Sequence, residues 1–251
     1  MKRAVSQKLA VFDIDGTLFR SSLLIELVHG LVDAGVFPEK ARKEMEADYL
    51  AWINRRGNYE NYISQVVRIH QHYIAGAGVQ SVRQVVLRVI DWQKDRVYRY
   101  TRDLLGELKK KNYYLLAISG SPAYIVSQFA DHMGFADSIA REFSVRGGMF
   151  TGENPNDEYL RRKDQVLKDF ITHSGIRADL GRSIAVGDTE GDIPMLELVG
   201  KPIAFNPNTT LAAYAKRKNW QIVVERKDVI YEIRDFSALS GGGKLAKRLR
   251  Q

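Results

Sequence analysis

The sequence predicts an α/β protein with a doubly wound, mostly parallel sheet. Two observations indicate this class. Short apolar runs that end in glycine or polar residues alternate with longer segments of helical periodicity, and a single all-helical stretch interrupts this alternation after the first run. Such apolar runs are typical of strands that a parallel sheet buries on both faces. With 251 residues, 45% of them apolar, the chain can form one large core and a smaller lobe.

Five apolar runs are predicted to be the strands of this sheet. In chain order they are residues 8–13, 113–119, 183–187, 202–205 and 221–224. The segments with helical spacing are predicted to cover the sheet, and they are residues 102–111, 124–133, 159–172 and 209–218. Residues 143–152, with Gly147 and Gly148 at their centre, are predicted to form a hairpin.

The all-helical stretch is predicted to be a separate domain inserted after the first strand. Its four amphipathic segments are residues 22–34, 38–55, 59–75 and 81–94. We therefore expect three parts. Residues 1–18 and 96–238 form the α/β core, residues 19–95 form a helical cap, and residues 239–251 form a flexible basic tail.

Candidate catalytic residues lie where the predicted strands end. In an open α/β sheet the ligand binds beyond the carboxyl ends of the strands, so Asp13, Ser119 and Asp188 are expected in one crevice. A carboxylate can attack phosphorus and form an aspartyl phosphate, which is the role predicted for Asp13. A second carboxylic acid, Asp15, can protonate the leaving oxygen and then activate water. An alternative interpretation of the segment Asp13-Ile14-Asp15-Gly16-Thr17 is an acidic turn in which Gly16 and Thr17 cap a helix.

A magnesium site is predicted in the same crevice. Two acids and a phosphate repel one another, and a hard divalent cation with oxygen ligands offsets that repulsion. Mg²⁺ is the expected cofactor, with Asp13 and Asp188 as direct ligands and the main-chain carbonyl of Asp15 as a third. Asp192 is expected to hold a metal-bound water or to orient a lysine, and its alternative role is a helix N-cap.

Phosphate-binding groups are predicted from Ser119, Gly120 and Lys163. The first two residues lie between a strand and a helix, and the N-terminus of a helix favours phosphate. An ordinary serine cap is the alternative. Lys163 would bring a positive charge to the phosphoryl oxygens. The alternative is a solvated basic helix surface, because Arg161, Arg162 and Lys168 are expected on the same helical surface as Lys163.

These motifs together resemble those of the haloacid dehalogenase superfamily of phosphatases. The resemblance rests on Asp13-Ile14-Asp15-Gly16-Thr17, Ser119-Gly120-Ser121, Lys163 and Gly187-Asp188 with Asp192, and it spans about residues 8–224. The helical insertion resembles the C1 type of cap, and the chain looks most like the phosphoserine phosphatase branch. The resemblance implies that Asp13 is the nucleophile and Asp15 the acid and base, that Ser119 and Lys163 bind phosphate, and that Asp188 binds magnesium.

The chain differs from that branch at the positions that are expected to bind the substrate. Phosphoserine phosphatases typically carry a glutamate nine residues after the nucleophile, and here that position is Ser22, with Glu26 one turn further on. Arg68 is the nearest candidate for the cap arginine that grips the substrate carboxylate. Arg20, where cap and core join, is a further candidate for substrate contact. The prediction is therefore a phosphatase for a small phosphorylated metabolite, with serine specificity left open.

Two other functions stay open. The same aspartyl phosphate would serve a phosphotransferase with another acceptor, and a net charge of +8 would suit a binding protein whose basic tail engages RNA or acidic lipid. We favour a solvated basic surface, without nucleic acid or membrane contact. A monomer and a homodimer are equally compatible with the sequence.

Composition excludes several kinds of site. The chain has no cysteine, which rules out disulfides and zinc sites with thiolate ligands. A membrane span needs about 20 apolar residues, a signal peptide needs an apolar block, and neither pattern is found, so a cytoplasmic protein is expected. His70 and His72 are two residues apart on a predicted helix, and both are predicted to lie at the surface.

Overall fold

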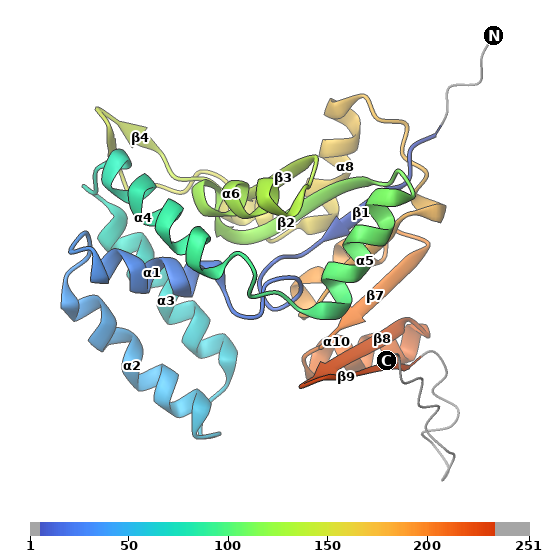
Figure 1. Ribbon diagram of the computed structural model, residues 1–251, viewed down its shortest axis with the longest axis horizontal. Helices are drawn as coiled ribbons and strands as arrows, with labels where there is room; N and C mark the ends of the chain where they lie inside the picture. The colour runs from blue at the N-terminus through green and yellow to red at the C-terminus, as the bar shows by residue number, and fades with distance from the viewer. Residues whose placement is uncertain (1–5, 234–251) are drawn as a thin grey trace.

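The computed structural model of the chain describes residues 6–233 and confirms the α/β class (Figure 1). Within these residues, seven strands form one sheet in the order β3-β2-β1-β6-β7-β8-β9, in which only the β8–β9 pair is antiparallel. The strands are β1 (Leu9–Phe12), β2 (Tyr114–Pro122), β3 (Asp137–Arg141), β6 (Ile184–Gly187), β7 (Lys201–Phe205), β8 (Gln221–Arg226) and β9 (Val229–Ile233). The predicted hairpin is formed by β4 (Val145–Arg146) and β5 (Met149–Phe150).

Helices cover both faces of the sheet, because successive side chains of a strand point to opposite sides. Ala10 and Phe12 of β1 belong to one hydrophobic cluster, together with buried residues of α5 (Arg99–Lys110) and α6 (Ala123–Met133). Leu9 and Val11 belong to the other cluster. It packs against α8 (Lys163–Ser174), α9 (Ile193–Leu196) and α10 (Thr209–Lys218). This arrangement is the doubly wound sheet that the sequence predicts.

Four helices lie between β1 and α5, where the sequence predicts a cap. They are α1 (Leu23–Asp33), α2 (Glu39–Ile53), α3 (Tyr59–Ile74) and α4 (Val79–Gln93). Figure 1 shows them as a group beside the sheet. Helix α1 is the most deeply buried of the four, and seven of its apolar side chains are in the core. Helix α2 buries only Ala41 and Met45 and is the outermost layer of the group.

The two connections between this helical group and the sheet run side by side. The Arg20 amide donates to the Arg96 carbonyl at 2.9 Å, and the Tyr98 amide donates to the Leu18 carbonyl at 3.0 Å. The chain therefore leaves the core and returns to it at nearly the same point, as expected for an inserted domain. The division into domains at residues 19 and 96 stays a prediction that this geometry supports.

Three expectations about the elements differ from the structure. The predicted helix 159–172 is broken into α7 (Asp157–Leu160) and α8, because Arg162 leaves the helical conformation with φ −104° and ψ 65°. Strands β3 and β9, at the two edges of the sheet, were not expected from the sequence. The prediction that His70 lies at the surface is wrong, because its side chain is buried and its Nε2 lies 2.6 Å from the Tyr124 hydroxyl.

Two remaining expectations concern the ends of the chain and its location. The predicted basic tail, residues 239–251, and residues 234–238 of the predicted core lie outside the described residues. Within residues 6–233, none of the helices combines the length and the apolar character that a membrane span requires. The cytoplasmic location stays a prediction.

Candidate active site

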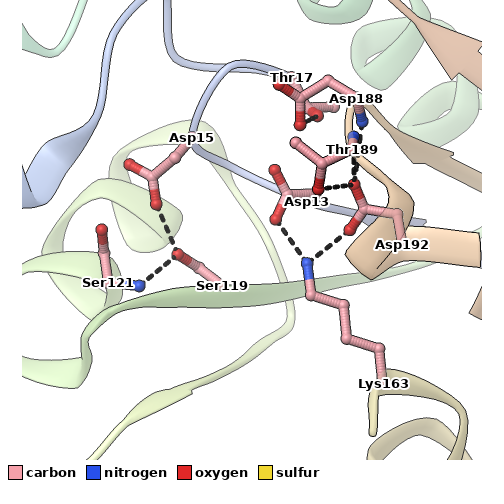
Figure 2. Close-up of polar contacts among 9 residues, drawn as sticks. All are labelled: Asp13, Asp15, Thr17, Ser119, Ser121, Lys163, Asp188, Thr189 and Asp192. Carbon is pink, nitrogen blue, oxygen red and sulfur yellow. Dashed lines mark hydrogen bonds and ion pairs between the residues drawn. The ribbon is translucent and has the colours of Figure 1, made fainter. Parts of the chain in front are cut away.

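Three aspartates converge at the carboxyl ends of two neighbouring strands. Asp13 directly follows β1, and Asp188 directly follows β6, which pairs with β1. Asp192 ends the short 3-10 helix Glu190–Asp192. One carboxylate oxygen from each lies within 4.8 Å of the others (Figure 2). The structure thus brings together the first and last acidic motifs of the sequence, at the point where the strand order reverses and open α/β sheets bind ligands.

Lys163 connects two of these carboxylates. Its Nζ lies 2.7 Å from Oδ1 of Asp13 and 2.6 Å from Oδ1 of Asp192, and its side chain is only 12% exposed. Lys163 is the first residue of α8, so the break at Arg162 turns its side chain toward the strand ends. Arg161, two residues earlier, is instead mostly exposed and pairs with Asp157.

Asp192 contacts the lysine that it was expected to orient, but its side chain does not act as a helix N-cap. It is instead the third residue of a capping box in which Thr189 is the N-cap. One oxygen contacts Lys163, and the other accepts from the amides of Asp188 at 2.9 Å and Thr189 at 3.0 Å, which completes a capping box. Because both of its oxygens are engaged, Asp13 and Asp188 are the carboxylates better able to bind a cation.

Asp15 lies apart from this cluster and faces β2. Ser119 donates its hydroxyl to Oδ2 of Asp15 at 2.9 Å (Figure 2), and the Leu23 amide donates to Oδ1 at 2.5 Å. The Ser121 amide in turn donates to the Ser119 hydroxyl at 3.0 Å. Burial raises the pKa of Asp15, although these hydrogen bonds oppose that rise. A carboxyl group with a raised pKa is suited to give and take a proton.

The acidic cluster holds more negative charge than its lysine can neutralise. Burial raises the pKa of Asp13 to about 7. The positive charge of Lys163 opposes this rise, and the negative charge of Asp192 adds to it. Burial, and then the charge of Asp13, raise the pKa of Asp188 well above its usual range. Burial opposes the charge of Lys163, but the carboxylates of Asp13 and Asp192 raise its pKa. Its ammonium therefore stays protonated.

These residues fit a hard divalent cation. Their donors are carboxylate oxygens, which Mg²⁺ and Ca²⁺ prefer, and they are close enough to share one ion. The carboxylate of Asp188 accepts a hydrogen bond from the Thr17 hydroxyl, at 3.2 Å, and has no ion pair among the residues that the structure describes. A bound cation would neutralise this half-buried carboxylate directly.

Two glycines make room for the carboxylates. Gly16 has a φ of +79°, which favours glycine, and a Cβ there would collide with the carboxylate of Asp188. A Cβ on Gly187 would collide with the side chain of Asp192. The glycines in both motifs are thus required by the close packing of the site.

A cavity of about 560 Å³ opens onto the cluster and is covered by α3. The predicted site residues in its lining are Asp13, Asp15, Ser22, Arg68, Gly120, Lys163 and Asp188. Ser22 is buried, and the exposed Arg68 donates to Gln65 at 3.0 and 2.6 Å. Residues of α3 that line the cavity recur at helical spacing and are Tyr59, Glu60, Ile63, Ser64, Val67, Arg68 and Gln71.

Arg20 and Glu26, both candidates for substrate contact, line a neighbouring cavity of about 870 Å³ instead. Glu26 accepts from Ser21 at 2.9 Å and from Arg96 at 2.7 Å, where the helical group joins the sheet. The structure therefore does not bring Arg20 and Glu26 into the cavity that opens onto the acidic cluster. Tyr59 lines both cavities and separates them.

Sequence reasoning missed three polar residues of the site. Thr17 bonds Asp188, Ser121 bonds Ser119, and Arg141 lines the cavity from the end of β3. The first two lie inside the motifs and could have been included for that reason. No feature of the sequence marks Arg141, because β3 itself was not predicted.

Comparison with known proteins points to one family. The family model described as haloacid dehalogenase-like hydrolase matches residues 10–197. An inhibition of morphological differentiation protein from Streptomyces azureus is 27% identical over 85% of this chain and 77% of that protein. A phosphoserine phosphatase from Methanocaldococcus jannaschii is 24% identical over 89% of this chain and 94% of that protein.

A solved structure shares the fold. It is described as a phospho-aspartyl intermediate analogue of phosphoserine phosphatase, and it superposes with a TM-score of 0.57 at 22% identity. The match covers 96% of this chain and all of that one. At this identity the likeness shows the fold alone.

Proposed function

Since this chain belongs to the haloacid dehalogenase-like hydrolase family, we propose that it is a phosphatase that hydrolyses a small phosphorylated metabolite through an aspartyl phosphate on Asp13. One observation carries the proposal. A buried carboxylate at a strand end, Asp13, is held at 2.7 Å by the ammonium of Lys163, beside a second acid and at the base of a cavity. The proposed nucleophile, a positive charge and the proposed metal ligands thus lie within contact distance of one another.

In the first half of the reaction, a carboxylate oxygen of Asp13 attacks phosphorus and the bond from phosphorus to the substrate oxygen breaks. Asp15 gives its proton to that leaving oxygen, so an alcohol departs. The hydrogen bonds from Ser119 and from the Leu23 amide support this role, because they fix the orientation of the Asp15 carboxyl group. Lys163 stabilises the charge on the phosphoryl oxygens.

In the second half, the ionised Asp15 takes a proton from water. The water oxygen attacks phosphorus, the bond from phosphorus to Asp13 breaks, and inorganic phosphate leaves. Asp13 and Asp15 then return to their starting protonation states. The raised pKa of Asp15 supports this cycle, because the same group must act as acid and as base near neutral pH.

Asp13 and Asp188 are proposed to hold Mg²⁺, with the main-chain carbonyl of Asp15. When bound, the ion supplies positive charge that offsets the repulsion between the carboxylates and the phosphoryl group. Asp192 accepts hydrogen bonds from Lys163 and from the amides of Asp188 and Thr189. Its proposed role is to position Lys163 and the loop after β6 rather than to bind the ion.

The substrate is proposed to lie between the strand ends and the inner face of α3. Ser22 stands where an amine-binding carboxylate would be needed and cannot supply that charge. Arg68 is the cationic residue that α3 contributes to this cavity, and it can pair with an anionic substrate group. A substrate panel should therefore compare phosphorylated hydroxy acids, amino acids, amino alcohols, sugars and nucleotides.

The test is Asp13→Asn, assayed for Mg²⁺-dependent phosphate release from this panel. We expect a loss of activity of roughly a thousandfold or more, because the amide cannot form the phosphoenzyme. The control is Asp33→Asn, which changes an exposed aspartate of α1 that pairs with Arg42. Full activity of Asp13→Asn on the best substrate would refute the mechanism. Repeating the assay with added alcohols separates hydrolysis from phosphoryl transfer to another acceptor.

A further inference from the structure

The phosphate-binding segment of β2 is a bulge in the sheet. Ile118 pairs with Ile139 and Pro122 pairs with Arg141, so residues 119–121 of β2 face only Ala140 of β3. A bulge removes main-chain groups from the ladder and changes the direction of the side chains. Here it carries the buried Ser119, whose hydroxyl reaches Asp15, out of the regular strand, and it brings Gly120 and Ser121 to the wall of the cavity.

The side chain of Arg141 fixes this bulge from the β3 side. Its Nε donates to the carbonyl oxygen of Gly120 at 2.9 Å, and its NH1 lies 3.0 Å from a carboxylate oxygen of Asp157, in an ion pair. The Arg141 side chain is only 14% exposed. Burying a guanidinium group is costly unless it is paired. The contacts with Gly120 and Asp157 therefore hold the Arg141 side chain in this buried position.

Arg141 also contributes to the wall of the catalytic cavity. It is close enough to the buried His70 of α3 for its charge to lower the pKa of that histidine, after the larger effect of burial. Arg141 therefore stands where three parts of the molecule meet, namely the bulge of β2, the start of α7 and the inner face of α3.

We propose that Arg141 is a positioning residue for the phosphoryl group. By holding the Gly120 carbonyl toward β3, it keeps the Ser119 hydroxyl on Asp15 and the Gly120 amide toward the cavity. Its positive charge adds to that of Lys163, which lines the same cavity. This inference rests on the proposed phosphatase function. It assigns to Arg141 a role that no motif of the sequence indicates.

The experiment compares the wild-type protein with Arg141→Met, Arg141→Lys and Arg99→Met. Arg99 is a matched control, because its guanidinium also donates to a main-chain carbonyl, that of Asp228 at 2.9 Å, but Arg99 does not line the cavity. Four quantities are measured. They are the dissociation constant of inorganic phosphate by calorimetry with Mg²⁺ present, kcat and KM on the best substrate, the Mg²⁺ concentration for half-maximal activity, and the melting temperature.

For Arg141→Met we expect phosphate binding and kcat/KM to weaken by about tenfold to a hundredfold, as for the loss of a charged hydrogen bond. The half-maximal Mg²⁺ concentration should stay within about twofold, because the acidic cluster is formed by other elements. Arg141→Lys should recover part of the loss, since it keeps the charge but not the planar fork. Arg99→Met should leave phosphate affinity unchanged.

Equal phosphate affinity in Arg141→Met and Arg99→Met would overturn the inference and leave a purely structural bridge between β3 and α7. If Arg141→Met does not fold, Arg141→Lys decides alone, and wild-type phosphate affinity in that variant would overturn the inference. A wild-type protein that hydrolyses nothing in the panel would instead refute the proposed function. The calorimetric titration with phosphate would still test Arg141 in that case.

Discussion

At the scale of single residues, the site is defined by an imbalance of charge. Three carboxylates lie close together near the ammonium of Lys163, which contacts Asp13 and Asp192 but leaves the half-buried Asp188 without an ion pair among the residues described. Burying a charge without a partner is costly, and such arrangements cluster at functional sites. Asp188 is therefore the carboxylate that would gain most from a bound cation.

His70 gives a prediction about pH at the same scale. Burial lowers its pKa from 6.5 to about 3, and the charge of Arg141 acts in the same direction. Below pH 6.5 the unfolded chain gains a proton that the folded protein excludes, so this histidine reduces stability as the pH falls toward 3. We expect the free energy of unfolding to decrease more steeply in the wild-type protein than in His70→Gln, by at most about 1.4 kcal/mol per pH unit.

Urea denaturation between pH 7.5 and 5 measures this difference. His72→Gln is the matched control, because His72 lies on the same helix but is exposed, and its curve should follow that of the wild type. The raised pKa values of Asp13 and Asp188 act with the opposite sign, but these residues are common to all three proteins. Parallel pH curves for wild type and His70→Gln would show that the ring is not held neutral.

At the scale of elements, the hairpin β4–β5 attaches the helical group to the core. The Phe150 amide donates to the Ala77 carbonyl at 3.0 Å, and the Val79 amide donates to the Gly148 carbonyl at 2.9 Å. Gly76 also donates to Phe150, at 2.8 Å. The turn between α3 and α4 is thus paired with the hairpin like a short strand. This contact is distant in sequence from the two connections at residues 19 and 96.

Val79→Pro tests this attachment. Val79 is the first residue of α4, a position where proline is well tolerated in a helix, so the substitution removes the amide bonded to Gly148 without breaking α4. We expect a loss of about 1 kcal/mol of unfolding free energy relative to Val79→Ala, which keeps the amide. Amide exchange at Phe150 should also become faster. Identical stability and exchange in the two variants would mean that the hairpin contact contributes nothing.

The elements that the sequence predicted correctly are those with a strong local pattern. The buried strands β1, β2, β6, β7 and β8 and the amphipathic helices α1 to α4 lie within a few residues of the expected ranges. Strands β3 and β9 were missed because edge strands are half-exposed and lack the continuous apolar run of a central strand. The break before Lys163 has no glycine or proline to signal it. It arises from tertiary packing, which buries Leu160 and directs Lys163 to the carboxylates.

At the scale of the whole molecule, the topology explains why so much of the site could be anticipated. The carboxyl ends of the parallel strands lie at one edge of the sheet, so Asp13 and Asp188 come together although they are far apart in the sequence, and Ser119 reaches Asp15 beside them. Side-chain direction could not be anticipated in the same way. Glu26 turns toward Arg96, and Arg141 turns toward Gly120, for reasons that only the packed structure contains.

The same topology links metal binding to the stability of the whole fold, because the proposed ligands come from β1 and from the loop after β6. Without metal, Asp188→Asn should raise the melting temperature, since it removes a buried charge while its carbonyl can still accept from Thr17. For the wild type, Mg²⁺ at a hundred times its dissociation constant should add about 2.7 kcal/mol, or roughly 5–10 °C.

Thermal unfolding with and without Mg²⁺ measures both effects, and Asp33→Asn serves as a control that should respond to the ion as the wild type does. In Asp188→Asn the response to Mg²⁺ should be abolished or greatly reduced, because the ion would lose one of its two carboxylate ligands. Equal stabilisation of Asp188→Asn and the wild type by Mg²⁺ would place the ion elsewhere. A lower melting temperature for metal-free Asp188→Asn would show that the buried carboxylate is already compensated by other groups.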